Sequence, residues 1–456
     1  MKNRITSLGL VLSLVVALSF CSIVSADSVN WRQEEGTALN VLFVAHPFVD
    51  AVRPLIPEFE AKTGIKINLE VQSEVPAFEK ILMDLQSRRG TIDVFMTSPL
   101  QVWQYATGGW VEALDGYLAD PQLTDLQAYD LDDFSPGVLA AGRWNLQPLG
   151  GVGEGNTWAL PINYETYITA YRYDLFQKFG LKAPTTYDEL AEVAKQLTFV
   201  AEDGKQIYGV TTRFDKYWDL PFLTYGTMVF SFDGEFIDDE GRVAIDSPEV
   251  VAATELFISI LQESAPASIG SNTWYDAMQQ FASGQYAIAM NEADLFAPVY
   301  EDPSQSMVAG LVGYAVPPAG PNGTIKANSW IWQVAMNSAS KNKNAAWLFM
   351  QWLTSKEVMA ETHLNGNMNP VRSSAWEDPR LVEMVESWGE YPGQYAEVQV
   401  TMLENYSGLW FPPHPELTRA LDRWAEAVQQ SFFEGGNVER NLQKAAQDIA
   451  TMLGLD

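Results

Sequence analysis

Residues 38–98 read ALNVLFVAHPFVDAVRPLIPEFEAKTGIKINLEVQSEVPAFEKILMDLQSRRGTIDVFMTS and alternate between strand-like and helical patterns. Short apolar or alternating runs predict strands, and apolar residues three and four apart predict amphipathic helices. The expected elements are strands at Ala38–Ala45, Ile65–Val71 and Ile92–Met96, and helices at Asp50–Thr63 and Phe78–Arg88. Strands that alternate with helices at this spacing indicate a parallel α/β sheet.

Ligands of parallel α/β sheets bind at the carboxyl ends of the strands. His46 and Phe48 follow the first expected strand and Ser98 follows the third, so all three are candidate ligand contacts. Each also has a structural interpretation. His46 and Phe48 could form the turn that enters the next helix, and Ser98 could cap the helix that follows it.

The same alternation continues through the rest of the chain. Gly150–Gly155 is rich in glycine, but a strand-like run containing a proline follows it, which predicts a surface loop rather than a phosphate-binding loop. Further helices are expected at Asp174–Gly180, Thr186–Leu197, Ser247–Leu261, Thr273–Ser283, Asn342–Leu353, Pro415–Phe433 and Val438–Leu453, and further strands at Thr166–Arg172, Ala287–Met290 and Ser329–Met336.

The N-terminus has the pattern of an export signal. Two basic residues precede an apolar stretch over Leu8–Phe20, and small residues end the segment at Ala26. This pattern predicts a signal peptide over residues 1–26 that is removed after Ala26, and hence a periplasmic or extracellular protein. Cys21 leaves lipid anchoring as the alternative.

The charge balance excludes some classes of partner. The chain carries 28 Lys and Arg against 58 Asp and Glu, a formal charge of −30. Nucleic acids and anionic membranes bind clustered basic residues, so neither is expected as a partner, and an anionic ligand is disfavoured. The 15 Trp and 18 Tyr residues instead suit the apolar faces of sugar rings, although most of them are expected in the core.

The sequence shows no catalytic or metal-binding pattern. A glycoside hydrolase needs two carboxylates at a fixed separation, and none of the many acidic residues lies in a pattern that marks such a pair. His46, His363 and His414 are far apart in sequence, and no HExxH or GxSxG motif occurs. We therefore expect no catalytic residue, no cofactor and no metal site. A secreted glycoside hydrolase is kept as the alternative function.

Several short motifs follow one another in order along nearly the whole mature chain. They are Gly109–Asp115 (GWVEALD), Trp158–Arg172, Asp174–Phe176 (DLF), Thr185–Leu190 (TTYDEL), Phe281–Met290 (FASGQYAIAM), Ala345–Glu357 (AAWLFMQWLTSKE), Asn367–Arg372 and Asn437–Ile449. Together they resemble the family 1 extracellular solute-binding proteins, the maltose-binding-protein-like carbohydrate receptors of ABC importers.

This resemblance implies a two-lobed α/β fold, the periplasmic-binding-protein fold, with discontinuous lobes and a hinge between them. It implies a first lobe over 38–157 plus 317–371 and a second lobe over 158–316 plus 372–456. It also implies a non-catalytic protein that closes its lobes over a ligand and then docks on importer permease subunits. Given the charge and the aromatic content, we expect a neutral sugar or polyol as the ligand, and a monomer.

Positions near the expected lobe crossings add candidate ligand contacts. Tyr164 and Glu165 lie near the first crossing, and Asn291 and Glu292 end the strand before the second. Arg372 lies beside the last crossing, where its guanidinium could donate hydrogen bonds to vicinal hydroxyls or pair with a nearby acid.

Aromatic segments supply the remaining candidates. Tyr217 and Trp218 lie in an aromatic and polar loop, and Asn328 precedes a strand that contains Trp330 and Trp332. Because side chains alternate along a strand, the two tryptophans share one face, and one could contact the ligand while the other lies in the core.

Overall fold

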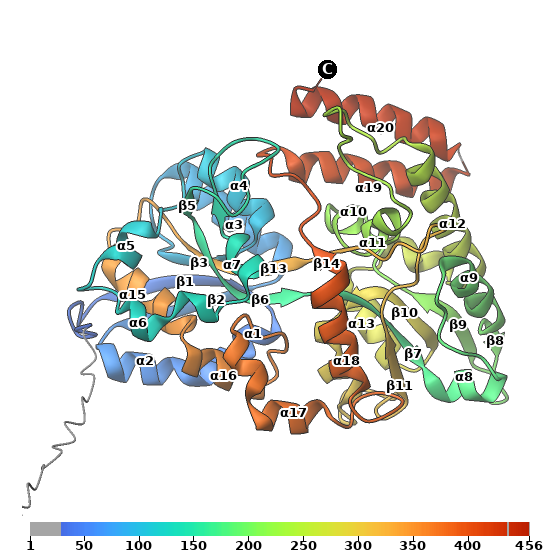
Figure 1. The fold of residues 1–456 in the computed structure, drawn as a ribbon, viewed down its shortest axis with the longest axis horizontal. Helices are drawn as coiled ribbons and strands as arrows, with labels where there is room; N and C mark the ends of the chain where they lie inside the picture. The colour runs from blue at the N-terminus through green and yellow to red at the C-terminus, as the bar shows by residue number, and fades with distance from the viewer. Residues whose placement is uncertain (1–28, 436, 456) are drawn as a thin grey trace, which may run out of the picture.

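The structure is a computed structural model that describes residues 29–435 and 437–455. The expected signal peptide over residues 1–26, which includes Cys21, lies outside the described residues. Two five-stranded sheets lie side by side, each with its own helices (Figure 1). Within the described ranges, no helix combines the length and the apolar character that a membrane span requires.

The first sheet contains the three strands expected near the start of the chain. Its order is β2 (Lys66–Gln72), β1 (Ala38–Val44), β3 (Val94–Thr97), β13 (Trp330–Met336) and β6 (Ala159–Glu165). β1 pairs in parallel with β2 and β3, which confirms the arrangement expected for these strands. β13 runs antiparallel to both β3 and β6. Every residue of β3, β6 and β13 is buried, as in sheets covered on both faces.

The helix expected over residues 50–63 is divided in the structure. It forms α1 (Pro47–Val52), a 3-10 turn at Arg53–Leu55 and α2 (Ile56–Thr63). Pro54 and Pro57 lack the N–H groups that a continuous helix needs, which explains the break. α2 ends at Gly64 as expected, with a φ of 74°, and a Cβ there would lie 2.6 Å from Cγ of Glu35.

The other helices of the first lobe surround its sheet. They are α3 (Glu74–Ser87), α4 (Pro99–Thr107), α5 (Asp115–Ala119), α6 (Leu126–Tyr129), α7 (Pro136–Ala140), α15 (Lys343–Leu353) and α16 (Lys356–Leu364). α3 and α4 each begin directly after a parallel strand, so their N-termini lie at the carboxyl edge of the sheet.

The second sheet has mixed strand directions. Its order is β11 (Val312–Ala315), β7 (Tyr167–Arg172), β10 (Tyr286–Ala293), β9 (Gln206–Thr211) and β8 (Phe199–Val200). β10 is parallel to β9 and antiparallel to β7. The helices with this sheet are α8 (Tyr173–Phe179), α9 (Tyr187–Gln196), α10 (Asp219–Phe222), α11 (Thr224–Ser231), α12 (Pro248–Ser264), α13 (Trp274–Ala282), α14 (Ala297–Glu301), α18 (Gln394–Thr401), α19 (Leu417–Glu434) and α20 (Val438–Leu453).

One extra residue interrupts the pairing of β10 with β7. Ala289 pairs with Ala170 and Glu292 pairs with Ile168, so β10 holds one residue more than β7 between these pairs. Asn291 lies in this bulge with a φ of 51°. Because successive strand residues point to opposite faces, the bulge sets the face of β10 on which Glu292 lies.

A buried carboxylate fixes the link between the two sheets. Thr166 is the single residue between β6 and β7. Asp294, directly after β10, accepts hydrogen bonds from the Thr166 hydroxyl at 2.6 Å and the Thr166 N–H at 3.2 Å. The amides of Asn369 and Gln399 donate to the same carboxylate at 2.7 and 2.6 Å. Segments that are far apart in the sequence are therefore joined at one buried group.

The division into lobes expected from the sequence stays a prediction, which the sheets help to refine. Because β6 belongs to the first sheet, we propose that the first crossing lies at Thr166 rather than at 157. The expected boundary at 316/317 stays as predicted. Because the Arg372 guanidinium binds first-lobe carbonyls, we propose that the last crossing follows Arg372 rather than precedes it.

Asp294→Asn is expected to lower the free energy of unfolding at pH 5 by about 2–4 kcal/mol. The new amide NH₂ group would face hydrogen-bond donors that the carboxyl oxygens now accept, and these donors would lose their partner. Burial raises the pKa of Asp294 to about 7, although hydrogen bonds from Thr166, Gln399 and Asn369 lower it in part. The folded protein therefore binds a proton that the unfolded chain releases near pH 4, so this contribution to stability falls as the pH rises towards 7. The destabilisation should be smaller at pH 8 than at pH 5.

Urea denaturation at pH 5 and pH 8 measures this effect. Asp188→Asn, at an exposed position in the first turn of α9, is the matched control and should change stability by about 0.5 kcal/mol or less. An Asp294→Asn protein as stable as the wild type at both pH values would contradict the role of Asp294 at this link.

Candidate ligand-binding site

A small cavity lies between the two sheets. It leaves about 20 Å³ open to water and receives side chains from both sides. Its lining consists of Glu74, Glu165, Trp330 and Trp332 from the first lobe, and Arg213, Trp218, Asp219, Leu223 and Trp274 from the second. The cavity thus combines flat apolar faces with carboxylates and one guanidinium, a set that can bind a ligand rich in hydroxyl groups.

Strand ends position the polar groups of the cavity. Glu74 is the first residue of α3, just after β2, and Arg213 follows the end of β9. His46 caps α1 after β1, and its Nδ1 accepts the Phe48 N–H at 3.1 Å. These placements agree with ligand binding at the carboxyl edges of parallel strands.

Glu165 is held in place by three neighbours in the cavity wall. Its Oε1 accepts the Trp332 indole N–H at 2.7 Å, and its Oε2 accepts the Tyr167 hydroxyl at 3.0 Å. Nε2 of His46 lies 3.8 Å from Oε1, and the His46 ring lies 5.2 Å from the Trp332 ring. Two donors therefore fix the orientation of this carboxylate before any ligand arrives.

Tryptophans from both lobes meet at the cavity. The Trp218 and Trp330 rings are stacked with centroids 4.7 Å apart, and Trp330 meets the Trp332 ring edge-to-face at 5.3 Å. Phe78 stacks on Trp332 at 6.2 Å. The sequence placed Trp330 and Trp332 on one face of their strand, and in the structure both line the cavity.

Arg213 is the centre of a buried ion network in the second lobe. Its guanidinium lies 3.0 Å from the Glu292 carboxylate and 3.2 Å from that of Asp219. The backbone N–H of Arg213 also donates to the Glu292 carboxylate, at 2.6 Å. Burial lowers the pKa of Arg213, but the neighbouring groups, chiefly Glu292 with Tyr167, Asp219 and Glu165, together outweigh burial and raise this pKa above its usual value. Oδ1 of Asp219 has no hydrogen-bond partner in the described structure. This oxygen is therefore available to a ligand hydroxyl.

Of the contacts predicted from the sequence, the structure brings five to the cavity region: His46, Glu165, Trp218, Trp330 and Trp332. Tyr217 lies next to this group, with its ring 5.1 Å from Trp218. Glu292 does not line the cavity, but its carboxylate pairs with the Arg213 guanidinium at 3.0 Å. Ligand contact by these residues stays a proposal.

The other predicted contacts do not line the cavity. Phe48 is fully buried in the core of the first lobe beside Phe43. Ser98 directly precedes α4, and its hydroxyl donates to the Gln101 side chain in the first turn of that helix. Tyr164 lies next to Glu165 along β6, so the strand alternation turns its side chain to the opposite face. Each of these residues serves the packing or hydrogen bonding of its own element.

Two asparagines predicted as contacts are occupied by local structure. Asn291 donates from its amide to the Tyr187 hydroxyl at 2.9 Å and to the Thr224 carbonyl at 3.2 Å. Asn328 accepts the Trp410 N–H at 2.8 Å. Their side chains are therefore committed to protein groups.

Arg372 is likewise used within the first lobe rather than in the cavity. It donates to the carbonyl of Thr354 at 2.7 and 2.9 Å, to that of Tyr129 at 2.9 Å and to that of Asp130 at 2.6 Å. Its guanidinium also lies 3.6 Å from Asp133. Thr354 and Asp130 end helices α15 and α6, so Arg372 satisfies carbonyls that have no partner inside a helix. Of the two roles expected for Arg372, pairing within the protein fits this arrangement.

Sequence reasoning missed four lining residues: Glu74, Arg213, Leu223 and Trp274. A fifth, Asp219, ends the aromatic and polar loop that the sequence singled out through Tyr217 and Trp218. The strand-end rule was applied to the first and third strands; applied to the second strand and to residues 206–211, it would have found Glu74 and Arg213. No local signal in the sequence marks Leu223 or Trp274.

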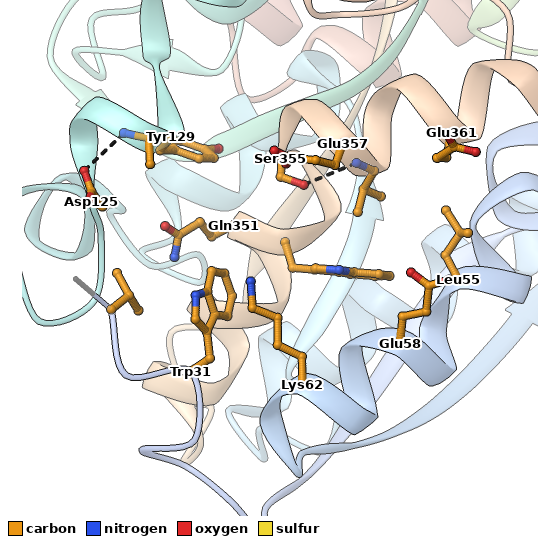
Figure 2. Close-up of a pocket in the computed structure, with 14 residues that line it drawn as sticks. Trp31, Leu55, Glu58, Lys62, Asp125, Tyr129, Gln351, Ser355, Glu357 and Glu361 are labelled. Carbon is orange, nitrogen blue, oxygen red and sulfur yellow. Dashed lines mark hydrogen bonds between the residues drawn. The ribbon is translucent and has the colours of Figure 1, made fainter. Parts of the chain in front are cut away.

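A larger hollow lies elsewhere on the first lobe (Figure 2). It is lined by Trp31, Tyr129 and Trp352 together with acidic residues such as Glu58 and Glu361. Its side chains all come from the first lobe, so closure of two lobes would not enclose a ligand there. The cavity between the sheets is therefore the candidate ligand-binding site. Within the part of the chain that the structure describes, no three His, Cys, Asp or Glu side chains group as a metal ion would need.

Comparison with known proteins agrees with this geometry. Residues 45–360 match the model of the family described as bacterial extracellular solute-binding protein. The chain belongs to this family. The match confirms the resemblance and the two-lobed α/β fold expected from the sequence.

The alignments with named relatives cover most of this solute-binding protein. It is 29% identical to the erythritol/L-threitol-binding protein of Mycolicibacterium smegmatis, over 93% of this chain and 88% of the relative. It is 28% identical to the mannitol-binding protein of Pseudomonas aeruginosa, over 71% of this chain and 70% of the relative. A solved solute-binding protein from Agrobacterium radiobacter K84 in complex with ribitol has a TM-score of 0.80 and 26% identity, and covers 92% of this chain and 99% of its own.

Arg213→Met is expected to lower the free energy of unfolding by about 3–5 kcal/mol, because it leaves Glu292 and Asp219 buried without their cation. Arg242→Met is the matched control, since Arg242 pairs with Asp238 and Glu240 at an exposed position and its loss should leave stability nearly unchanged. Urea denaturation followed by tryptophan fluorescence distinguishes the two variants. Equal effects would show that the buried network does not stabilise the second lobe.

Proposed function

We propose that this solute-binding protein captures a small neutral sugar or polyol in the cavity between its lobes and delivers it to an ABC importer. The observation that carries this proposal is the lining of the cavity. The indole rings of Trp218, Trp274, Trp330 and Trp332 give the cavity apolar surface that suits the C–H groups of a polyol. The carboxylates of Glu165 and Asp219 can accept hydrogen bonds from its hydroxyls. Such pairing gives orientation through hydrogen bonds and affinity through apolar contact.

The narrowness of the cavity favours a short ligand. With the lobes together it leaves about 20 Å³ open to water, which is room for about one water molecule. The lobes must therefore separate to admit a ligand, and a polyol or monosaccharide needs less separation than an oligosaccharide. This agrees with the erythritol or L-threitol, mannitol and ribitol named for the related proteins.

The charges of the cavity favour a neutral ligand over an anionic one. Among the described lining residues Arg213 is the one cation, and Glu292 and Asp219 already pair with it. A phosphate or carboxylate group would instead meet the carboxylates of Glu74 and Glu165.

Closure of the lobes is the mechanism that we propose for capture. The Tyr275 hydroxyl, at the start of α13, donates to the Ala45 carbonyl, just after β1, at 2.7 Å. This bond joins the second lobe to the first beside the cavity. A hinge at Thr166 would let the lobes separate to admit ligand and then re-form the bond over it.

The cellular setting of the proposal follows from the sequence and the family. We propose export by a signal peptide cleaved after Ala26, with lipid anchoring at Cys21 as the alternative, and a periplasmic or extracellular location. The partners would be importer permease subunits, and the protein would act as a monomer without enzymatic turnover.

A thermal-shift screen against erythritol, ribitol, D-mannitol and D-glucose tests the ligand class, and one of these should raise the melting temperature. Trp218→Ala should weaken binding of that ligand by about 10–100-fold, because an indole face is lost. Trp410→Ala, at a half-exposed position that does not line the cavity, is the matched control and should bind as the wild type does. Release of chromophore from chromogenic glycosides would instead favour the hydrolase alternative.

Tyr275→Phe tests the closure step. Loss of the hydroxyl removes one hydrogen bond made across the lobes, so ligand affinity should fall about 2–10-fold. The effect should lie mainly in faster dissociation, measured by stopped-flow tryptophan fluorescence. Tyr391→Phe, whose hydroxyl bonds Glu397 on the surface, should leave dissociation unchanged. An unchanged dissociation rate in Tyr275→Phe would argue against this contact as part of closure.

A further inference from the structure

Glu74 stands out among the lining residues because no protein cation pairs with it. It lines the cavity from the first lobe, and none of the described residues donates a hydrogen bond to it or forms an ion pair with it. Lys80, on the same helix, pairs with Glu70 at 2.6 Å instead. No described protein group bonds the Glu74 carboxyl directly, which leaves it available to a ligand.

The groups that face Glu74 include three carboxylates but a single guanidinium. They are Arg213, Asp215, Tyr217 and Asp219 from the segment that follows β9, Tyr275 from α13, and Glu165, backed by His46, from the first lobe. The single guanidinium is already shared by Asp219 and Glu292. In the closed cavity the carboxylates therefore outnumber the protein cations that could neutralise their charge.

Closure itself creates this imbalance around Glu74. Glu74 and Glu165 belong to the first lobe, whereas Asp215 and Asp219 belong to the second. With the lobes apart, the second-lobe groups move away from Glu74 at the start of α3, and water solvates its charge. With the lobes together, it loses water and gains like charges, and both changes favour the protonated form.

The titration of Glu74 agrees with this geometry. Enclosure in the cavity raises the pKa of its carboxyl to about 8, and the Asp219 carboxylate adds to the rise. The N-terminus of α3 favours the ionised form, but it does so in the open and closed states alike, so it does not alter the difference between them.

We infer that capture of a neutral polyol is coupled to protonation of Glu74, and that an amino polyol is a second class of ligand whose ammonium group replaces this proton. The inference rests on the function proposed above. The proton comes from the buffer and converts the Glu74 carboxylate to a carboxylic acid, which can donate one hydrogen bond to a ligand oxygen and accept others. A protonated amine brings its own positive charge, so Glu74 stays ionised and pairs with it.

The sign of the pH dependence follows from linkage. The closed, liganded state holds a proton that the open state releases above about pH 4.3, the usual pKa of a glutamic acid. Affinity for a neutral polyol should therefore fall as the pH rises and level off above pH 8, with a loss of roughly 10–50-fold between pH 6 and pH 8. Affinity for the amino polyol should stay nearly constant, because its ammonium is charged throughout this range.

Calorimetric titration of the full-length mature protein at pH 6.5, in two buffers with different ionisation enthalpies, measures the proton uptake. The probes are erythritol, ribitol and D-mannitol, and the 1-amino-1-deoxy counterpart of whichever binds. We expect an uptake near one proton for the neutral polyol and near zero for the amine. Glu74→Gln should abolish the uptake and flatten the affinity of the neutral polyol between pH 6 and pH 8.

Glu79→Gln is the matched control, because Glu79 lies on the same helix but is exposed. It should retain the wild-type uptake and pH dependence. Polyol binding without proton uptake in the wild type, or uptake that persists in Glu74→Gln, would overturn the inference and leave the proposed function intact. Failure of every sugar and polyol to bind at any pH would overturn the proposed function, and the inference with it.

Discussion

The arrangement of the two lobes depends on one buried carboxylate, that of Asp294. It accepts hydrogen bonds from Thr166, Asn369 and Gln399, which lie in different segments at the junction of the sheets. An ionisable group without partners would be costly there, and four donors make it tolerable. Because Glu165 directly precedes Thr166, the bonds that fix the junction also fix one wall of the cavity. The ligand site and the hinge are therefore adjacent along the same chain.

Much of the scaffold was predictable from local sequence patterns. Apolar periodicity gave β1, β2 and β3 with their parallel order, and it placed α20 at the residues expected. Alternation in β13 correctly put Trp330 and Trp332 on one face. These features depend on neighbours within one element, which a single sequence displays directly.

The polar half of the site was harder to predict because its partners are far apart in the sequence. Arg213 pairs with Glu292 across 79 residues, and Arg372 binds the carbonyl of Asp130 across 242. A charged residue near a loop looks the same in sequence whether it faces a ligand or satisfies a helix end. The antiparallel direction of β13 was also missed, because strand direction depends on how distant segments connect. The division of the helix near Pro54 was missed as well.

The bulge at Asn291 has a consequence for how such a protein can change over evolution. The extra residue keeps Glu292 turned towards Arg213, while Asp294, two positions further along the chain, stays at the hinge. Deleting one residue from this stretch would move both groups out of register at once. Substitutions can thus alter ligand preference one side chain at a time, whereas insertions and deletions in β10 are expected to be selected against. Variation in length should accumulate instead in the surface loops, such as the one around Gly204.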